Sequence, residues 1–417
     1  MKRFIIVAAA ALMIFPVVSY AGNATSRWDL TLGGYIKFDM GYSTQGVNAD
    51  YNKAARGSYG MYENREDEYG SLFAAGGETR LHFAIKGPDA WGAKTSGFVE
   101  AEFRGQTGDY GELNLRHAYM RIKSANDTLT IGHTWQKWGL LLTHSNILLG
   151  VNMLEAFVKG KRQPQIMWDH NFNKNYGFSF GVISNTNSLG NRTIDDFAIS
   201  PYPFLEGELK YTSDACGKIG TWQMLFAVDG FYGWERKVWD ADPAAAVGYD
   251  DDLNNAWGLA LKGLVPIIPE RKGNKAGALA VAGEIFMSQN PGWHLGSFSL
   301  GSYNRGTATD PDYAYPRLSG GRGQVSYWIT NSLFITGWYG QMRYTLSDRY
   351  KTVNRNAIER EQQYIVNLSY DVNQAMRFGL EWDYIKTEYA NYSAATAPFL
   401  DKSGDMHAIR IGAWYFF

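Results

Sequence analysis

The chain has 417 residues, of which 40 are basic and 41 acidic, so its formal net charge of −1 gives no support to a nucleic-acid partner. A single cysteine excludes an internal disulfide and a Cys-rich metal cluster. Aromatic residues make up 15% and glycines number 46, a composition typical of membrane strands in which every second side chain faces lipid.

The first 21 residues have the order of a secretory signal peptide. Lys2 and Arg3 precede an apolar run over residues 4–18, and "SYA" at residues 19–21 has the small-x-small pattern of a cleavage site. The alternative is an uncleaved anchor helix, for which the apolar run is short. We therefore expect a cleaved signal peptide over 1–21 and one exported domain over 22–417.

Alternating side chains begin soon after this segment. In "WDLTLGGYIKFDMGYS", residues 28–43, Leu30, Ile36 and Phe38 share one parity, whereas Lys37 and Asp39 share the other. Such alternation predicts a strand with one apolar and one charged face. The chain ends on "IRIGAWYFF", which alternates in the same way, so the last strand is expected to pair with the first. Fourteen further strands are predicted at 77–87, 94–106, 112–124, 128–136, 161–171, 174–186, 204–214, 217–232, 252–268, 276–288, 317–330, 331–347, 358–371 and 373–388.

The connections between these strands alternate between short and long. The short ones include "GPDAWG", "SANDT", "NFNKN" and "DVNQ", and the one exception among the long set is 107–111. Outer-membrane barrels have short periplasmic turns, longer outside loops and an even strand number. We therefore predict an all-β fold, a transmembrane antiparallel β-barrel of about 16 strands with both termini periplasmic. A soluble sandwich would not require this alternation. The long connections are predicted at 45–76, 137–160, 187–203, 233–251, 289–316, 348–357 and 389–403.

The charged residues, which occupy one face of each predicted strand, indicate what lines the interior of the barrel. An arginine or lysine that faces lipid at mid-depth costs about 2–4 kcal/mol, so the charged residues must face the lumen. Both signs occur, which leaves ion selectivity open, although a basic cluster in the front half would favour anions slightly. The predicted pore-lining residues on strands are Arg80, His82, Lys86, Glu100, Glu102, Arg104, Arg121, Arg162 and Arg410.

The connection at about 137–161 is unusually apolar for an outside loop. Its residues 147–158 carry an apolar stripe at helical spacing, which must be buried. We expect this loop to fold into the barrel as a constriction, with Glu155, Lys159, Lys161 and Arg162 toward the lumen. The alternative is a stripe that packs on a neighbouring subunit.

Several stretches resemble known outer-membrane proteins. The terminal aromatic strand is similar to the C-terminal signature of Gram-negative outer-membrane proteins, which implies that Tyr415 and Phe417 form a signal for the barrel-assembly machinery. "LRHAYMRI" at 115–122, "LTIGHTWQKWG" at 129–139 and "RQPQIMW" at 162–168 resemble trimeric porins of the DcaP-like type, and more weakly the OmpJ porins. The resemblance implies a homotrimer and an inward third loop.

The function expected from these features is a passive outer-membrane porin for small hydrophilic solutes and ions, with outer-membrane lipid as its surroundings. No enzyme activity, cofactor or metal is expected, because the sequence lacks G-x-S-x-G and H-E-x-x-H motifs and its seven histidines are scattered. "SGGRGQ" at 319–324 lacks the Lys-Ser/Thr of a phosphate loop and is predicted to be a turn or strand start. The alternatives are a barrel that sheathes a separate cytochrome and, less favoured, an outer-membrane hydrolase.

Overall fold

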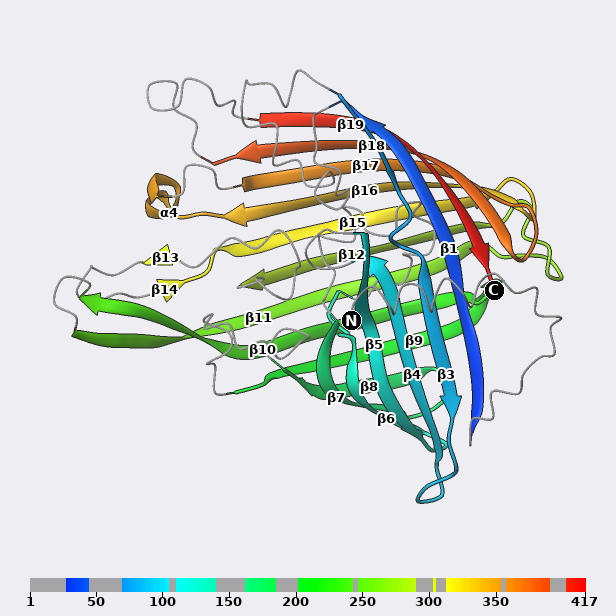
Figure 1. The fold of residues 1–417 in the computed structure, drawn as a ribbon, viewed down its shortest axis with the longest axis horizontal. Coiled ribbons are helices and arrows are strands. Elements are labelled where there is room, and N and C mark those ends of the chain that lie inside the picture. Colours follow the sequence, from blue (N-terminus) through cyan, green and yellow to red (C-terminus); the bar gives the residue numbers. More distant parts are fainter. Residues whose placement is uncertain are drawn as a thin grey trace, which may run out of the picture.

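The chain forms a closed antiparallel barrel (Figure 1). The structure is a computed structural model that describes residues 28–44, 70–104, 110–139, 162–184, 202–242, 247–289, 303–304, 313–353, 358–390 and 403–417. The main sheet has 17 strands, but β2 and β3 follow one another along β1 and fill one place, which leaves sixteen around the barrel. The barrel closes where β1 pairs with β19. The predicted transmembrane barrel of about sixteen strands is confirmed.

The strand bounds agree closely with the alternation in the sequence. The main sheet consists of β1 (Asp29–Ser43), β2 (Ser71–Ala75), β3 (Arg80–Lys86), β4 (Lys94–Arg104), β5 (Tyr110–Lys123), β6 (Asp127–Trp135), β7 (Arg162–Asn171), β8 (Tyr176–Ile183), β9 (Phe204–Ile219), β10 (Trp222–Asp242), β11 (Val247–Ile268), β12 (Leu279–Gln289), β15 (Arg317–Trp328), β16 (Leu333–Thr345), β17 (Ile358–Asp371), β18 (Met376–Tyr389) and β19 (Ser403–Phe416). Two short strands, β13 (Tyr303–Asn304) and β14 (Tyr313–Ala314), pair with each other, and α4 (Asp348–Val353) is a single short helix. No helix in the described part of the chain is long and apolar enough to cross a membrane.

The two faces of the wall differ in chemistry. In β1, Ile36 and Phe38 are 57% and 49% exposed, whereas Lys37 and Asp39 are 2% and 1% exposed. The same alternation runs along β19, where Ile409 and Ile411 are exposed on either side of buried Arg410. Successive side chains of a strand point to opposite faces, so the apolar set covers the outside and the charged set faces the interior. This is the polarity of a barrel whose outer surface contacts lipid.

One end of the barrel, called here the turn end, carries the short connections. The side-chain oxygen of Asn373 accepts the N–H groups of Ala375 and Met376 at 2.8 and 3.0 Å, and Asn173 does the same in its own turn. Asparagine closes such turns because its side chain substitutes for a backbone acceptor. The last strand also ends here, since the Phe416 N–H donates to the Ala375 carbonyl at 2.7 Å. The opposite end is called the loop end.

Closure of the barrel involves the last residue of the chain. The N–H and carbonyl of Phe417 exchange hydrogen bonds with the carbonyl and N–H of Gly34, each at 3.2 Å. Beside them, the rings of Tyr35 and Phe416 meet edge to face at 5.9 Å between centroids. Tyr415 and Phe417 are both half exposed on the outside. The predicted pairing of the last strand with the first is therefore confirmed.

Three sequence predictions differ from the structure. The expected long connection at 233–251 is mostly strand, because β10 continues to Asp242 and β11 begins at Val247, and this hairpin projects past its neighbours (Figure 1). The β9–β10 turn lies at Gly220, whose φ of 58° suits glycine, and not near 215–216. The predicted connection 45–76 contains β2 near its end, whereas 319–324, predicted to be a turn or strand start, lies inside β15 and within the predicted strand 317–330.

Candidate functional site

The first half of the barrel presents a charged wall to the interior, formed by ion pairs across β1, β3, β4 and β5. Arg116 is the centre of this wall, and its guanidinium lies 2.7 Å from Glu100 and 2.5 Å from Glu102. The Arg80 guanidinium lies 3.6 Å from Glu102. The ammonium of Lys37 pairs with Glu78 and lies 3.3 Å from Asp39. Buried charges are tolerated in proteins when they are paired in this way.

Residues of the connection after β6 contact the inner face of the strands that follow it, β7, β9 and β11. The Lys262 ammonium on β11 donates to the Lys137 carbonyl at 2.8 Å, and the Trp138 N–H donates to the Glu206 carboxylate on β9. The Lys137 ammonium in turn pairs with Asp169 on β7 at 2.5 Å. Lys137 and Trp138 therefore join β7, β9 and β11 from inside the barrel.

The same Lys262 holds a compact set of carboxylates. Its ammonium lies 2.9 Å from Asp229 on β10 and 3.4 Å from Glu208 on β9. The Lys262 and Asp229 side chains are 1% and 0% exposed. The lysine therefore compensates two carboxylates and positions the Lys137 carbonyl at once.

Beyond Trp138 the interior is apolar. The Trp138 ring lies 5.0 Å from Phe231 and 6.4 Å from Phe286, both edge to face. A Cβ on Gly258 would lie 2.8 Å from Trp138 and 2.4 Å from Phe231, so glycine is required for this packing. The interior is thus divided between a charged wall and an apolar wall. The number of charges on the inward-facing positions of the sequence had not suggested an apolar wall. The apolar wall comprises Trp138, Ile183, Phe204, Phe231, Ala256, Ala260, Phe286, Leu318, Trp338, Met342, Tyr344 and Ile365.

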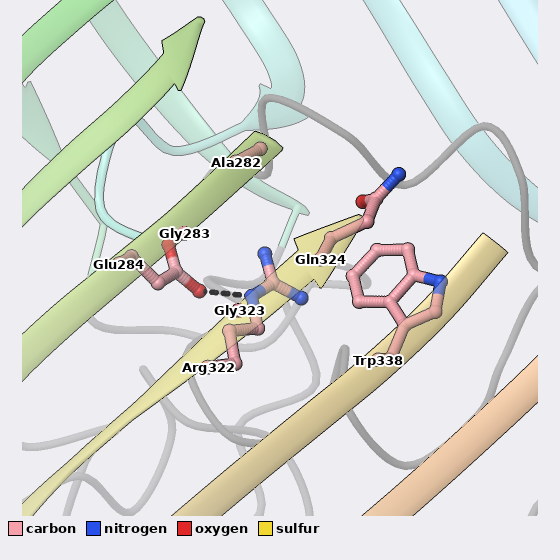
Figure 2. A pocket seen from close by; sticks show the side chains of 7 residues that line it. All are labelled: Ala282, Gly283, Glu284, Arg322, Gly323, Gln324 and Trp338. Carbon is pink, nitrogen blue, oxygen red and sulfur yellow. Dashed lines mark ion pairs between the residues drawn. The ribbon is translucent and has the colours of Figure 1, made fainter. Parts of the chain in front are cut away.

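Two more ion pairs lie on the second half of the wall. Arg322 of β15 pairs with Glu284 of β12 at 2.5 Å, and its guanidinium lies 5.6 Å from the Trp338 ring centroid (Figure 2). The space between them is about 10 Å³, enough for about one water molecule. Further round the barrel, Arg410 lies 2.8 Å from Asp383, and both side chains are fully buried.

Several of the predicted lining residues lie on the inner face of the barrel. Arg80, Glu100 and Glu102 belong to the charged wall, and the His82 ring lies beside that of Phe98, with centroids 5.2 Å apart and planes inclined by 30°. Lys86 is exposed at the turn end, at the last position of β3. A Cβ on Gly33 would lie 2.5 Å from His82, which explains the glycine opposite it.

The remaining predicted lining residues differ in their surroundings. Arg121 lies 4.5 Å from the Tyr119 ring centroid, and Arg162 lies 4.6 Å from the Trp135 ring centroid. Arg104 is the last residue of β4, and its Cα pairs with Tyr110. Glu155, Lys159, Lys161 and the apolar stripe at 147–158 lie outside the described residues.

Sequence reasoning missed several of the closest ion pairs. Lys262, Asp229, Glu284 and Arg322 were not among the predicted lining residues, although each stands on the inward parity of a predicted strand. Their inward-facing positions in the alternating pattern would have identified them from the sequence. Within the described ranges, no three His, Cys, Asp or Glu side chains lie close enough together to hold a metal ion.

Comparisons with known proteins agree with this geometry. No family model and no curated protein matches the chain. Among solved structures, the outer membrane channel DcaP of Acinetobacter baumannii is similar with a TM-score of 0.70 at 18% identity, over 96% of this chain and 99% of that one. An anion-selective porin from Comamonas acidovorans has a TM-score of 0.56 at 11% identity, over 94% and 100%. The trimer form of OmpT from Vibrio cholerae has a TM-score of 0.51 at 10% identity, over 94% and 99%. The chain therefore has the fold of the outer-membrane porins.

Proposed function

We propose that this protein is an outer-membrane porin, a water-filled channel through which small hydrophilic solutes and ions diffuse passively. The observation that carries the proposal is a closed barrel with an apolar outside and an inside lined by ion pairs of both signs. A polar lumen is the feature by which porin barrels conduct. The similarity in fold to DcaP and to the Comamonas porin supports the same conclusion.

We further propose that the segment at about 137–161 narrows the channel. Support comes from its first residues, because Lys137 and Trp138 are hydrogen-bonded to Lys262 on β11 and Glu206 on β9, at the inner face of the barrel. A segment that starts inside the barrel cannot stand wholly outside it. The charged residues Glu155, Lys159 and Lys161 of the same segment, together with Arg162, would then act on passing solutes. Removing residues 143–157 is expected to raise single-channel conductance and weaken selectivity, whereas unchanged conductance with loss of oligomers would favour a role at a subunit contact.

The remaining features of the proposal concern export and assembly. Residues 1–21 are proposed to be a cleaved signal peptide that exports the chain to the outer membrane of a Gram-negative cell. Tyr415 and Phe417 are proposed as the signal for the barrel-assembly machinery, supported by the position of Phe417 at barrel closure. A homotrimer in outer-membrane lipid is proposed by analogy with the OmpT trimer form.

Two other functions would be recognised by separate observations on the purified protein. A barrel that sheathes a cytochrome would co-purify with a haem protein, and a hydrolase would release product from lipid or ester substrates. No observation on the described residues favours either of them over a channel.

The test is ion current through planar bilayers that contain the purified protein. Stepwise openings with a linear current–voltage relation are expected for a passive water-filled pore. A preparation that is folded by its heat-modifiable mobility yet gives no steps above the bare bilayer would overturn the proposal.

A further inference from the structure

The wall formed by β4, β5, β6 and β7 contains a cavity of about 310 Å³ next to Lys137. This volume is within the range of pockets that bind small molecules. The cavity has an aromatic floor, defined here as Phe98, Tyr119 and Trp135, and its rim carries Arg121. It lies in the proposed channel, beside the point where the chain enters the lumen.

The aromatic floor is continuous across three strands. The rings of Phe98 and Tyr119 are stacked, with centroids 5.5 Å apart and planes inclined by 25°. His117 meets Tyr119 and Trp135 edge to face at 6.2 and 6.4 Å. Neighbouring side chains lie against the faces of these rings, Arg121 over Tyr119 and Arg162 over Trp135, but the rings are only partly buried and part of each lines the cavity. A planar ring can pack edge to face against such a surface.

The acidic side chains that line the cavity are paired, whereas one of its basic side chains forms no ion pair within the described part of the chain. Glu100 is paired with Arg116 at 2.7 Å, and Asp169 accepts from Lys137 and from the Ser179 hydroxyl, each at 2.5 Å. Among the described residues no carboxylate forms an ion pair with Arg121, which is exposed. The lining therefore offers one uncompensated cation beside an aromatic surface.

Arg121 is also held in place. Its guanidinium lies over the Tyr119 ring at 4.5 Å, and its Nε donates to the Thr130 hydroxyl at 3.3 Å. A guanidinium fixed in this way keeps donors free for a carboxylate, to which arginine bonds in bidentate geometry.

We propose that this cavity is a binding site for planar aromatic molecules that carry a single carboxylate. The ring packs edge to face against the aromatic floor, and the carboxylate pairs with Arg121. A second carboxylate gains nothing, because Lys137 is already paired with Asp169. The inference rests on the proposed function, since solutes must reach the lumen, and it adds a preferred class of solute to a general channel.

Equilibrium dialysis of the purified full-length protein tests the proposal with four probes. Benzoate is expected to bind saturably. Benzamide, which lacks the charge, and cyclohexanecarboxylate, which lacks the planar ring, are each expected to bind about tenfold more weakly or worse. Terephthalate, with two carboxylates, is expected to bind no more tightly than benzoate.

Matched variants locate the site. Arg121→Gln is expected to raise the dissociation constant for benzoate about tenfold, the loss of one charge-assisted contact. Lys123→Gln removes the same charge two residues along β5, outside the cavity, and is expected to change it less than about twofold. Both variants must show heat-modifiable barrels before they are compared.

Several results would overturn the assignment. Equal binding of benzoate and cyclohexanecarboxylate would exclude packing of the ligand ring against the aromatic floor, and equal binding of benzoate and benzamide would exclude recognition by Arg121. Equal effects of the two variants would place binding elsewhere. Absence of benzoate binding by a protein that conducts ions in bilayers would refute this site and leave the porin function standing, whereas absence of conductance would refute the porin function itself.

Discussion

Replacement of Lys262 by methionine should strongly destabilise the barrel. The Lys262 ammonium contacts Asp229 at 2.9 Å, Glu208 at 3.4 Å and the Lys137 carbonyl at 2.8 Å, and its side chain is 1% exposed. Methionine fills the same volume without the charge, so the buried Asp229 carboxylate loses its partner. Loss of one member of a buried ion pair costs about 3–5 kcal/mol. The unfolding equilibrium constant should therefore rise by about two to nearly four powers of ten.

The assay is reversible unfolding in guanidinium chloride of protein folded into lipid vesicles, followed by tryptophan fluorescence. Lys210→Met on β9 is the control, because Lys210 also faces inward and forms no ion pair with any residue in the described ranges. Lys262→Met combined with Asp229→Asn removes both charges and should recover at least half of the loss. The reasoning is refuted if Lys262→Met and Lys210→Met cost the same, or if the double variant is no more stable than Lys262→Met alone.

Three further predictions follow from the wall itself. Ile411→Arg places a cation on the outer face near the middle of β19 and should lower the free energy of unfolding by about 2–4 kcal/mol. The control His407→Arg places the same cation nearer the loop end and should lower that free energy by only about 0–1 kcal/mol. Equal losses for the two variants in the guanidinium chloride titration would contradict the assigned outer face. Gly258→Val should displace Trp138, which should destabilise the barrel by about 1–3 kcal/mol and raise single-channel conductance. A stable variant with unchanged conductance would argue against the packing of Trp138 on Gly258. Deletion of Phe417 removes its two hydrogen bonds to Gly34 and should reduce the yield of assembled barrel in cells far more than a polar insertion at 389–403; similar yields would count against the terminal signal.

Alternation predicts most of this fold because lipid and water impose opposite requirements on successive side chains. The last strand was predicted as far as Phe417, and Arg410, predicted to face inward, is buried between the exposed Ile409 and Ile411. The rule loses its force beyond the lipid. The outer parts of β10 and β11, up to Asp242 and from Val247, need no apolar face there, so their polar sequence resembled a loop.

The interior was harder to predict than the wall. Glycines in 319–324 suggested a turn, yet a Cβ on Gly320 would lie 2.9 Å from Phe286, so the glycine serves close approach within β15. The site beside Arg121 depends on a register shift opposite Glu100 and Ala101. The extra residue of β5 at this shift lets Arg116 pair with Glu100 while His117 joins Tyr119 and Trp135. Such a shift is decided by pairing between strands, and a single sequence does not contain it.

The most direct test of the central claim is the swelling of liposomes that contain the purified protein, measured with uncharged sugars of increasing size. A water-filled lumen narrowed at Lys137 and Trp138 predicts rapid swelling with small sugars and a steep fall in rate as the sugar grows. Rates no greater than those of protein-free liposomes would contradict the account, because a folded barrel with this interior would then be closed to solutes.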